Sequence, residues 1–394
     1  DLSNYSLAWT LVEDGVETQQ GTIDNLDVPA QQTKNITIPY DKSKVTGKEV
    51  LLNVDFRLKN AEPLMQAGQV VAYAQMPVVT PAKACDGCAK QLAQGNGKKK
   101  MKLADKKNNE VAVTTPNLTF KINRSTGLIS EYAYNGKSLL GEGGTLKPNF
   151  WRAPTDNDMG AQLQKKFKAW KNPQMNLKNI DVKKDKKANT VTVVTSFDMP
   201  EVQGQLDITY LVFANTGAVK VTEDFKATEG AKVSDLFRFG MLLQMPYSME
   251  KSTYYGRGPI ENYSDRKDCM RIGIYNDDAD NQYFPYIRPQ ESGTKSDMRW
   301  WKQTDATGLG LQVKSCEPFY ASALHFDTDE LDDGDEKEQR HSYELKKSKF
   351  TNLFLDAAHM GVGGENSWGA WPLEKYRIHY GNKTFNFVLI PQGK

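Results

Sequence analysis

The stretch VTVVTSFDMPEVQGQLDITYLVFANTGAVKVTEDF, residues 191–225, decides the fold class of this chain. Apolar residues recur at alternate positions in Val191–Phe197, Leu206–Phe213 and Val219–Phe225. This two-residue period is typical of β-strands that bury one face and expose the other. The stretch therefore predicts three strands in succession.

Further strands are predicted on both sides of this stretch. Upstream they are Val111–Val113, Leu118–Ile122 and Ile129–Tyr134, with turn residues at Arg124–Gly127 and Asn135–Gly136. Downstream they are Phe237–Met245, Leu309–Val313, Phe319–His325, Ser342–Leu345, Thr351–Leu355 and Tyr376–Leu389. Ala161–Trp170 is the one helical candidate. A TIM barrel needs about 250 residues of regular β–α alternation, which is missing, so we expect residues 108–394 to form one large antiparallel β-sandwich.

Residues 1–80 predict a separate, smaller β domain. Leu7, Trp9 and Leu11 alternate with less apolar residues, and Glu13-Asp14-Gly15 is a hairpin-type turn. Several short strands with turn signals over about 80 residues are typical of an immunoglobulin-like β-sandwich. A Cys…Trp…Cys pattern is absent from this segment, so an antibody-type domain is excluded.

Residues 81–107 differ in composition and predict a linker. They are rich in Lys, Ala and Gly, and no aromatic residues interleave with the lysines from Lys98 to Lys107, which favours a solvated connector over a nucleic-acid patch. Cys85 and Cys88 form a single CxxC pair, which is a weak zinc signal; we interpret them as loop thiols whose role is open. The acidic run Asp327–Glu338 is interpreted as a solvated loop.

The overall composition excludes several classes of protein. The chain has 394 residues, enough for at least two domains, with 39% hydrophobic and 25% charged residues, which excludes disorder as the main state. Lys and Arg number 51 against 49 Asp and Glu, so neither nucleic acid nor an anionic membrane is expected as a partner. Asp1 begins the sequence without a signal-peptide pattern, and we interpret the chain as a processed product or a piece of something longer.

Four clusters combine Gly or Pro with charge and an aromatic ring, which is typical of loops and strand ends. They are NFWRAPTDND (149–158), YGRGPIENYSDR (255–266), PYIRPQESG (285–293) and HMGVGGENSWG (359–369). Carboxylates, amides and guanidinium groups bind sugar hydroxyls, and Trp or Tyr stacks on sugar C–H faces. Besides tryptophans, the candidate substrate-binding residues are therefore Arg152, Asp156, Asp158, Glu261, Asn262, Arg288 and Glu291.

A structural alternative accounts for the same residues, and we favour it for most of them. Arg152, Arg257, Arg266 and Arg288 can pair with Asp156, Asp158, Glu261 and Glu291, and thereby tie loops together inside a large sandwich. The glycine-rich segment His359–Gly364 matches neither GxGxxG nor a P-loop, so a phosphate site is not expected there.

The four clusters, in this order and spacing, resemble the C-terminal domain of bacterial β-galactosidases of glycoside hydrolase family 2. WTLVEDGVETQQGTI (9–23) and LLNVDFRLKN (51–60) are similar to the immunoglobulin-like domain that precedes it in that family. The resemblance covers nearly all of the chain except the region around Cys85–Lys107. It implies that residues 108–394 form a β-supersandwich of the galactose-mutarotase type.

The resemblance also implies which parts lie elsewhere. In that family a sugar-binding jelly-roll, another immunoglobulin-like domain and a catalytic TIM barrel come first, and the barrel carries both catalytic glutamates. We therefore assign no catalytic residue, metal ligand or cofactor to this chain; Mg²⁺ or Na⁺ is expected only at the parent active site. The implied partners are galactose or a β-galactoside and the catalytic domains, with homo-oligomerisation and the compartment, bacterial cytoplasm or periplasm, left open.

Trp368 receives a role from the resemblance. It stands at the position of a family tryptophan that reaches the active-site mouth and stacks on the sugar or aglycone, and Trp371 is the second candidate. Two positions depart from the commonest family pattern: Glu365 replaces a frequent Asp, and Ile260 a frequent His or aromatic residue. Neither change removes the assignment of Trp368.

Two other functions compete with a non-catalytic β-galactosidase part. An aldose 1-epimerase needs a general acid and base across the sugar ring, but none of His325, His341, His359 and His379 lies in a matching motif. A free-standing carbohydrate-binding module is the other alternative. For the isolated chain we expect weak or no sugar binding, because one stacking Trp makes few contacts.

Overall fold

The structure is a computed structural model that describes residues 1–81, 98–366 and 368–393. The described chain forms two compact units. The first contains the residues before the gap at 82–97 together with Arg271–Ile274, and the second contains the rest. Strands dominate both units, so the prediction of an all-β fold is confirmed. The exact domain boundaries stay a prediction.

The first unit is built on one antiparallel sheet with the strand order β2-β1-β3-β4. Its strands are β1 (Tyr5–Glu13), β2 (Val16–Ile23), β3 (Val50–Leu58) and β4 (Val70–Val79). Asp14 and Gly15 join β1 to β2 with φ values of 49° and 89°. Two consecutive left-handed residues match the right-handed twist of a two-residue hairpin, which confirms the turn predicted here.

One face of this sheet carries the core of the first unit. Leu7, Trp9 and Leu11 of β1 pack beside Val50 and Leu52 of β3. The layer that covers them comes from residues 24–49, whose contacting side chains include Leu26, Ile36 and Ile38. Within the described residues this covering segment contains no strand and one short 3-10 helix, η1 (Lys42–Lys44).

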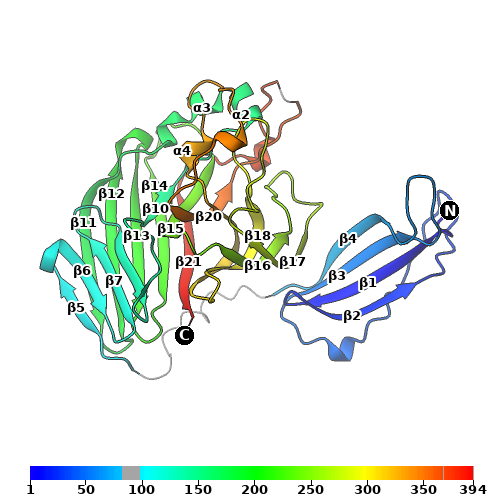
Figure 1. Cartoon of the computed structure of the whole chain (residues 1–394), viewed down its shortest axis with the longest axis horizontal. Coiled ribbons are helices and arrows are strands. Elements are labelled where there is room, and N and C mark those ends of the chain that lie inside the picture. Colours follow the sequence, from blue (N-terminus) through cyan, green and yellow to red (C-terminus); the bar gives the residue numbers. More distant parts are fainter. Residues whose placement is uncertain (82–97, 367, 394) are drawn as a thin grey trace. The chain divides into compact units, whose positions relative to one another are not determined.

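The second unit contains a twelve-stranded and a five-stranded antiparallel sheet (Figure 1). The smaller sheet runs β5 (Lys102–Asp105), β6 (Glu110–Thr114), β7 (Leu118–Asn123), β8 (Ile129–Tyr134) and β9 (Lys137–Ser138). The main path of the larger sheet is β10 (Leu146–Asn149), β15 (Arg238–Pro246), β20 (Phe350–His359), β19 (Gly310–Leu324), β21 (Lys383–Gln392), β14 (Val219–Ala227), β13 (Gly204–Phe213), β12 (Thr190–Met199) and β11 (Asn176–Asp185). A branch joins β19 through β18 (Lys295–Thr304) to β16 (Lys251–Gly258) and β17 (Arg271–Asp278).

The two sheets enclose the main hydrophobic core. In Figure 1 the small sheet lies beside β11, β12 and β13. The rings of Phe120 in the small sheet and Tyr210 in the large one are 6.0 Å apart. The Tyr132 hydroxyl also donates to the Gly217 carbonyl oxygen at 2.8 Å. The large antiparallel sandwich predicted from the alternating pattern is therefore present.

Short helices gather at one end of the large sheet (Figure 1). They are α2 (Asp156–Gly160), α3 (Leu163–Lys166), η3 (Lys168–Trp170) and α4 (Thr328–Leu331). The remaining short helices are η2 (Lys107–Asn109), η4 (Pro200–Val202), η5 (Ser342–Glu344) and η6 (Glu374–Tyr376). The helix predicted over Ala161–Trp170 is thus divided, because Phe167 between α3 and η3 leaves the helical conformation.

Three strand predictions need correction. Ser342–Leu345 is not a strand but contains η5, and its Tyr343 is 85% exposed, so the apolar ring has no core to fill. The strand predicted from Tyr376 begins only at Lys383. The two strands predicted at Leu309–Val313 and Phe319–His325 are one long strand, β19.

The acidic run Asp327–Glu338 is not simply a solvated loop, which corrects that interpretation. Asp332 is buried, and it accepts hydrogen bonds from Trp151 Nε1 at 2.8 Å and Lys171 Nζ at 2.7 Å. Asp333 is also buried, and it pairs with Arg288 at 2.7 Å and Arg340 at 2.9 Å. The two carboxylates are therefore structural anchors for the end of the sheet.

Cys85 and Cys88 lie outside the described residues. No helix in the described ranges has the length and apolar character needed to cross a bilayer.

Glu223 of β14 is a buried acid without a hydrogen-bond partner, which leads to a stability prediction. Burial raises the pKa of its carboxyl group well above the ordinary value, and the nearby Asp356 adds to the effect. The folded state therefore binds a proton that the unfolded state releases above its own pKa. The contribution of Glu223 to stability is therefore greatest below the pKa that its carboxyl group has in the unfolded state. It decreases as the pH rises toward the pKa of the same group in the folded state.

Glu223→Met is expected to raise the free energy of unfolding at pH 7 by about 1–3 kcal/mol, because it removes both an unsatisfied buried polar group and the proton uptake that folding requires there. The gain should shrink toward pH 4, where the carboxyl group is protonated in both states. Urea unfolding at both pH values measures it, with Asp224→Asn, on the other face of β14, as the control. A gain that does not depend on pH would contradict this explanation.

Candidate functional site

The loop after β20 carries Trp368, whose side chain is 85% exposed. Asn366 organises the backbone next to it: the Asn366 Oδ1 atom accepts from the Trp368 N–H at 2.9 Å and from the Ala370 N–H at 3.4 Å. An exposed indole on a backbone held in this way presents a flat apolar face to a ligand without large ordering cost.

Two side chains hold the base of this loop. One donates hydrogen bonds to backbone carbonyl groups, and the other accepts hydrogen bonds from backbone N–H groups. Arg152 is fully buried and donates from Nη1 to the Met360 carbonyl at 2.7 Å and from Nη2 to the Gly361 carbonyl at 2.9 Å. The Asp265 carboxylate accepts from the backbone N–H groups of Val362 at 3.1 Å and Gly363 at 2.8 Å. Four consecutive residues before Trp368 are therefore fixed by charge-assisted bonds.

The glycines of this loop make that approach possible. A Cβ atom on Gly361 would lie 2.5 Å from Asp265 Oδ2, and one on Gly363 would lie 3.2 Å from the same atom. Any side chain at Gly361 would displace the carboxylate from the amides that it holds. The GVGG run thus serves to admit Asp265 rather than a phosphate group.

Asp158 explains why Arg152 is positioned so firmly. Arg152 donates from Nε and Nη2 to the two Asp158 carboxylate oxygens at 3.0 and 2.8 Å. Asp158 also accepts from the Thr155 N–H at 2.9 Å, while the Thr155 hydroxyl caps the Asp158 N–H at 3.2 Å. This capping box begins α2 and satisfies its first amide groups.

A second buried charge cluster lies at the end of β15 and β20. Arg238 donates to both Asp356 oxygens, the shortest contact being 2.6 Å, and lies 3.6 Å from Glu291 Oε2. Burial raises the pKa of Asp356 to about 6, against the opposing effect of Arg238. Burial likewise raises the pKa of Glu291 and lowers the pKa of the neighbouring His359 well below its usual range.

The remaining candidate residues also have protein partners. Arg288 pairs with Asp156 at 3.1 Å and with Asp333, and it donates to the Pro154 carbonyl at 3.0 Å. Asn262 is fully buried and bonds the Ser296 backbone N–H at 2.9 Å. Trp371 is only partly buried and packs edge-on against Phe167, with ring centroids 5.6 Å apart.

Glu261 joins the second motif to the third. It accepts from Arg266 Nη2 at 2.5 Å, from the Tyr286 hydroxyl and from the Gly293 N–H at 2.8 Å. Together with Asp156 and Glu291 it lines a cavity of about 170 Å³ that also includes Val362 of the Trp368 loop. The structure therefore brings residues of all four motifs together around this cavity.

Three of the four arginines pair with an acid of the predicted set: Arg152 with Asp158, Arg266 with Glu261, and Arg288 with Asp156. Arg257 pairs with Asp297 instead, outside the predicted set. The sugar-binding role of the candidate residues stays a prediction. In the part of the chain that the structure describes, no three His, Cys, Asp or Glu side chains form a metal-binding group.

Comparisons with known proteins decide the family. The model for the β-galactosidase small chain matches residues 114–389, and the model for β-galactosidase domain 4 matches residues 1–79. The chain belongs to the β-galactosidase small-chain family. Its two matched regions correspond to the C-terminal part of a bacterial β-galactosidase.

Curated relatives match almost the whole chain. A β-galactosidase of Priestia megaterium is 29% identical over 99% of this chain and 36% of its own length. A β-galactosidase of Lactobacillus delbrueckii subsp. bulgaricus is 29% identical over 93% of this chain and 34% of its own length. The chain therefore spans about a third of the length of these relatives.

Solved structures are more distant. A putative aldose 1-epimerase of Escherichia coli K12 has a TM-score of 0.38 and 9% identity, with 74% of this chain and 99% of that chain covered. A galactose mutarotase related enzyme of Lactobacillus acidophilus has a TM-score of 0.37 and 8% identity, with 72% and 97% covered. Likeness at this level carries no conclusion about activity.

Several residues that hold the Trp368 loop or form the second buried charge cluster were not selected from the sequence. Asp265 was quoted within its motif but received no role, and Arg238 and Asp356 lie inside strands that look ordinary apart from their charge. A charge within an otherwise apolar strand, as in RFGMLLQM or FTNLFLDAAH, is the signal that identifies the last two.

Proposed function

We propose that this chain is the non-catalytic C-terminal part of a β-galactosidase that hydrolyses terminal β-D-galactose residues with retention of configuration. The proposal is supported by the match of nearly the whole chain to proteins named β-galactosidase, each of which is about three times as long. Within the complete enzyme, this part would supply one wall of the substrate pocket.

The observation that carries the pocket role is the geometry of Trp368. Its indole is 85% exposed, although four preceding backbone groups are fixed by Arg152 and Asp265. A protein rarely holds a bare indole in place without a ligand or partner to cover it. Stacking on the C–H face of a galactoside would use that surface.

The acids of the four motifs support a non-catalytic role. Retaining glycosidases need a nucleophile and an acid/base about 5–5.5 Å apart, both free to reach the sugar. Asp158, Asp156 and Glu261 are each paired with an arginine, and Asp265 is occupied by two backbone amides. These carboxylates are therefore committed to structure, and the reaction would use acids on other polypeptide.

Partners and cofactors follow from the same proposal. The substrate would be a β-galactoside, and the catalytic domains would be the main protein partner. Mg²⁺ or Na⁺ would bind at the catalytic centre rather than in this chain.

Hydrolysis of a chromogenic β-galactoside by the chain alone tests the division of labour. We expect the rate to equal that of buffer. Turnover that disappears when one of the chain's own carboxylates is replaced by an amide would contradict the proposal. Polarimetry on fresh α-galactose, run in parallel, tests epimerase activity, for which we expect mutarotation at the buffer rate.

Trp368→Ala tests the pocket role in the complete polypeptide. We expect KM to rise about tenfold or more, because a central aromatic contact is typically worth over 1 kcal/mol. Trp368→Tyr keeps a stacking ring and should restore most of the affinity, whereas Tyr343→Ala, which removes an equally exposed ring outside the four motifs, is the matched control. An unchanged KM in Trp368→Ala would remove the proposed role.

A further inference from the structure

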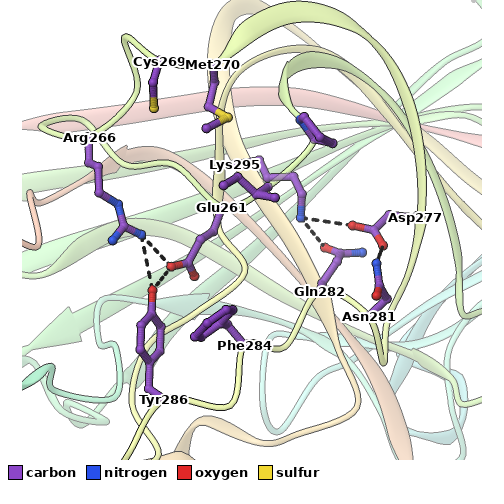
Figure 2. A pocket seen from close by; sticks show the side chains of 12 residues that line it. Glu261, Arg266, Cys269, Met270, Asp277, Asn281, Gln282, Phe284, Tyr286 and Lys295 are labelled. Carbon is purple, nitrogen blue, oxygen red and sulfur yellow. Dashed lines mark hydrogen bonds and ion pairs between the residues drawn. The ribbon is translucent and has the colours of Figure 1, made fainter. Parts of the chain in front are cut away.

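A second cavity of about 350 Å³ lies within the second unit, lined by parts of the second and third motifs (Figure 2). Its volume falls within the range of small-molecule sites. No residue of the Trp368 loop is among those described as lining it. The pocket role proposed for Trp368 therefore leaves this cavity unexplained.

The charges around the cavity neutralise each other. Glu261 is paired with Arg266 at 2.5 Å, and Lys295 Nζ lies 3.5 Å from Asp277 Oδ2. Figure 2 shows the two pairs on different sides of the cavity. Because each acid faces its own base, the site offers little net field to attract an anion or a cation. A neutral ligand fits this balance.

Hydrogen-bonding capacity remains after these pairs are formed. Arg266 is 49% exposed and uses only its Nη2 atom within the described chain, so its Nε and Nη1 donors are left for a ligand. Asn281 donates from Nδ2 to Asp277 at 2.7 Å, and its side-chain oxygen has no bonded partner among the described residues. Donors and an acceptor are therefore both available.

An exposed ring completes the cavity. The Phe284 side chain is 54% exposed, and its ring lies 4.6 Å from that of Tyr286, tilted by 50°. Ile260, which is 61% exposed, adds apolar lining. A flat apolar face beside fixed polar groups matches a molecule with one C–H face and a rim of hydroxyl groups.

We propose that this cavity binds one neutral pyranose unit of a carbohydrate, stacked on Phe284 and hydrogen-bonded by Arg266 and Asn281. This site is distinct from the Trp368 loop and does not depend on the role proposed for that residue. It gives the small-chain region a sugar contact of its own.

Methyl β-D-galactopyranoside is the probe for the first test, because its blocked anomeric carbon cannot condense with the Lys295 amine. Saturation-transfer NMR and calorimetry on the whole chain should detect binding with a dissociation constant on the order of 1 mM, as expected for few contacts. The ring protons of one sugar face should receive the strongest saturation.

Variants locate the site. Phe284→Ala should weaken binding about tenfold or more, and Phe284→Tyr should restore it. Ile287→Ala is the matched control, because Ile287 is 87% exposed on the same loop but does not line the cavity. Phe284→Ala should weaken binding to the same extent when it is added to Trp368→Ala, because Trp368 does not line the cavity. Circular dichroism shows whether each variant keeps its fold.

Two results would overturn the inference. The first is no saturation transfer to the wild-type chain at about 50 mM sugar, well above the expected dissociation constant. The second is binding that survives Phe284→Ala and disappears in Trp368→Ala. That second result would place the sugar on the Trp368 loop, so it would reject this cavity while supporting the proposed function.

Discussion

Replacing Arg238 by Met is expected to lower the free energy of unfolding by about 3–5 kcal/mol, the typical cost of breaking a buried ion pair from one side. Arg238 is 1% exposed, and its guanidinium group contacts Asp356 at 2.6 Å and Glu291 at 3.6 Å. The substitution leaves both carboxylates buried without their cation. Urea unfolding at pH 7.5 measures the loss.

The pH dependence separates this cause from a simple packing defect. Without Arg238 the carboxyl groups can avoid the buried charge only by taking up protons, so the stability deficit should shrink as the pH falls toward 5. Lys165→Met is the control, because Lys165 pairs with Glu336 at the surface, where such a pair is worth about 0–1 kcal/mol. A deficit equal at both pH values would contradict the electrostatic explanation.

Arg152→Met is expected to cost a similar 3–5 kcal/mol and, in addition, to release the Trp368 loop. The Asp158 carboxylate would lose both of its guanidinium bonds, and the carbonyls of Met360 and Gly361 would lose their donors. Hydrogen exchange followed by mass spectrometry should show faster exchange in the peptide that contains Val362 and Gly363.

A second substitution distinguishes loop release from general destabilisation. Asp158→Asn added to Arg152→Met removes the buried charge, so global stability should recover in part while loop exchange stays fast. Arg238→Met alone is the comparison for a variant of similar instability. Exchange at Val362 and Gly363 that rises no more than in Arg238→Met would show that Arg152 does not hold the loop specifically.

These two arginines explain how the site is organised. Arg238 lies at the end of a strand of the large sheet, and Arg152 lies in a loop. Each forms hydrogen bonds with carbonyl or carboxylate groups from segments that are distant in sequence. Arg152 contacts residues more than two hundred positions away. The exposed Trp368 thus depends on a buried polar frame, which is expensive to disturb because its members have no water to replace a lost partner.

Local pattern was a good guide to the strands that bury one face completely. Strands β12, β13 and β14 lie where the alternation of residues 191–225 predicted them, and the hairpin turn at Asp14-Gly15 followed from residues that adopt positive φ readily. Prediction was poorer where burial comes from distant parts. Tyr343 looked like a strand residue, but it is 85% exposed, with its ring stacked on that of His341. Asp332 looked solvated but is enclosed by Trp151 and Lys171.

The amino-acid sequence alone determined the strand-rich class, the order of the four motifs and the resemblance that they carry, because alternation and motif spacing are properties of neighbouring residues. The tertiary structure alone decided which charges meet. Asp265 reaches the amides of Val362 and Gly363, and Arg238 reaches Asp356, only because antiparallel pairing brings remote strand ends to one edge. Long-range pairing of this kind depends on the whole sheet, so no local signal in the chain can specify it.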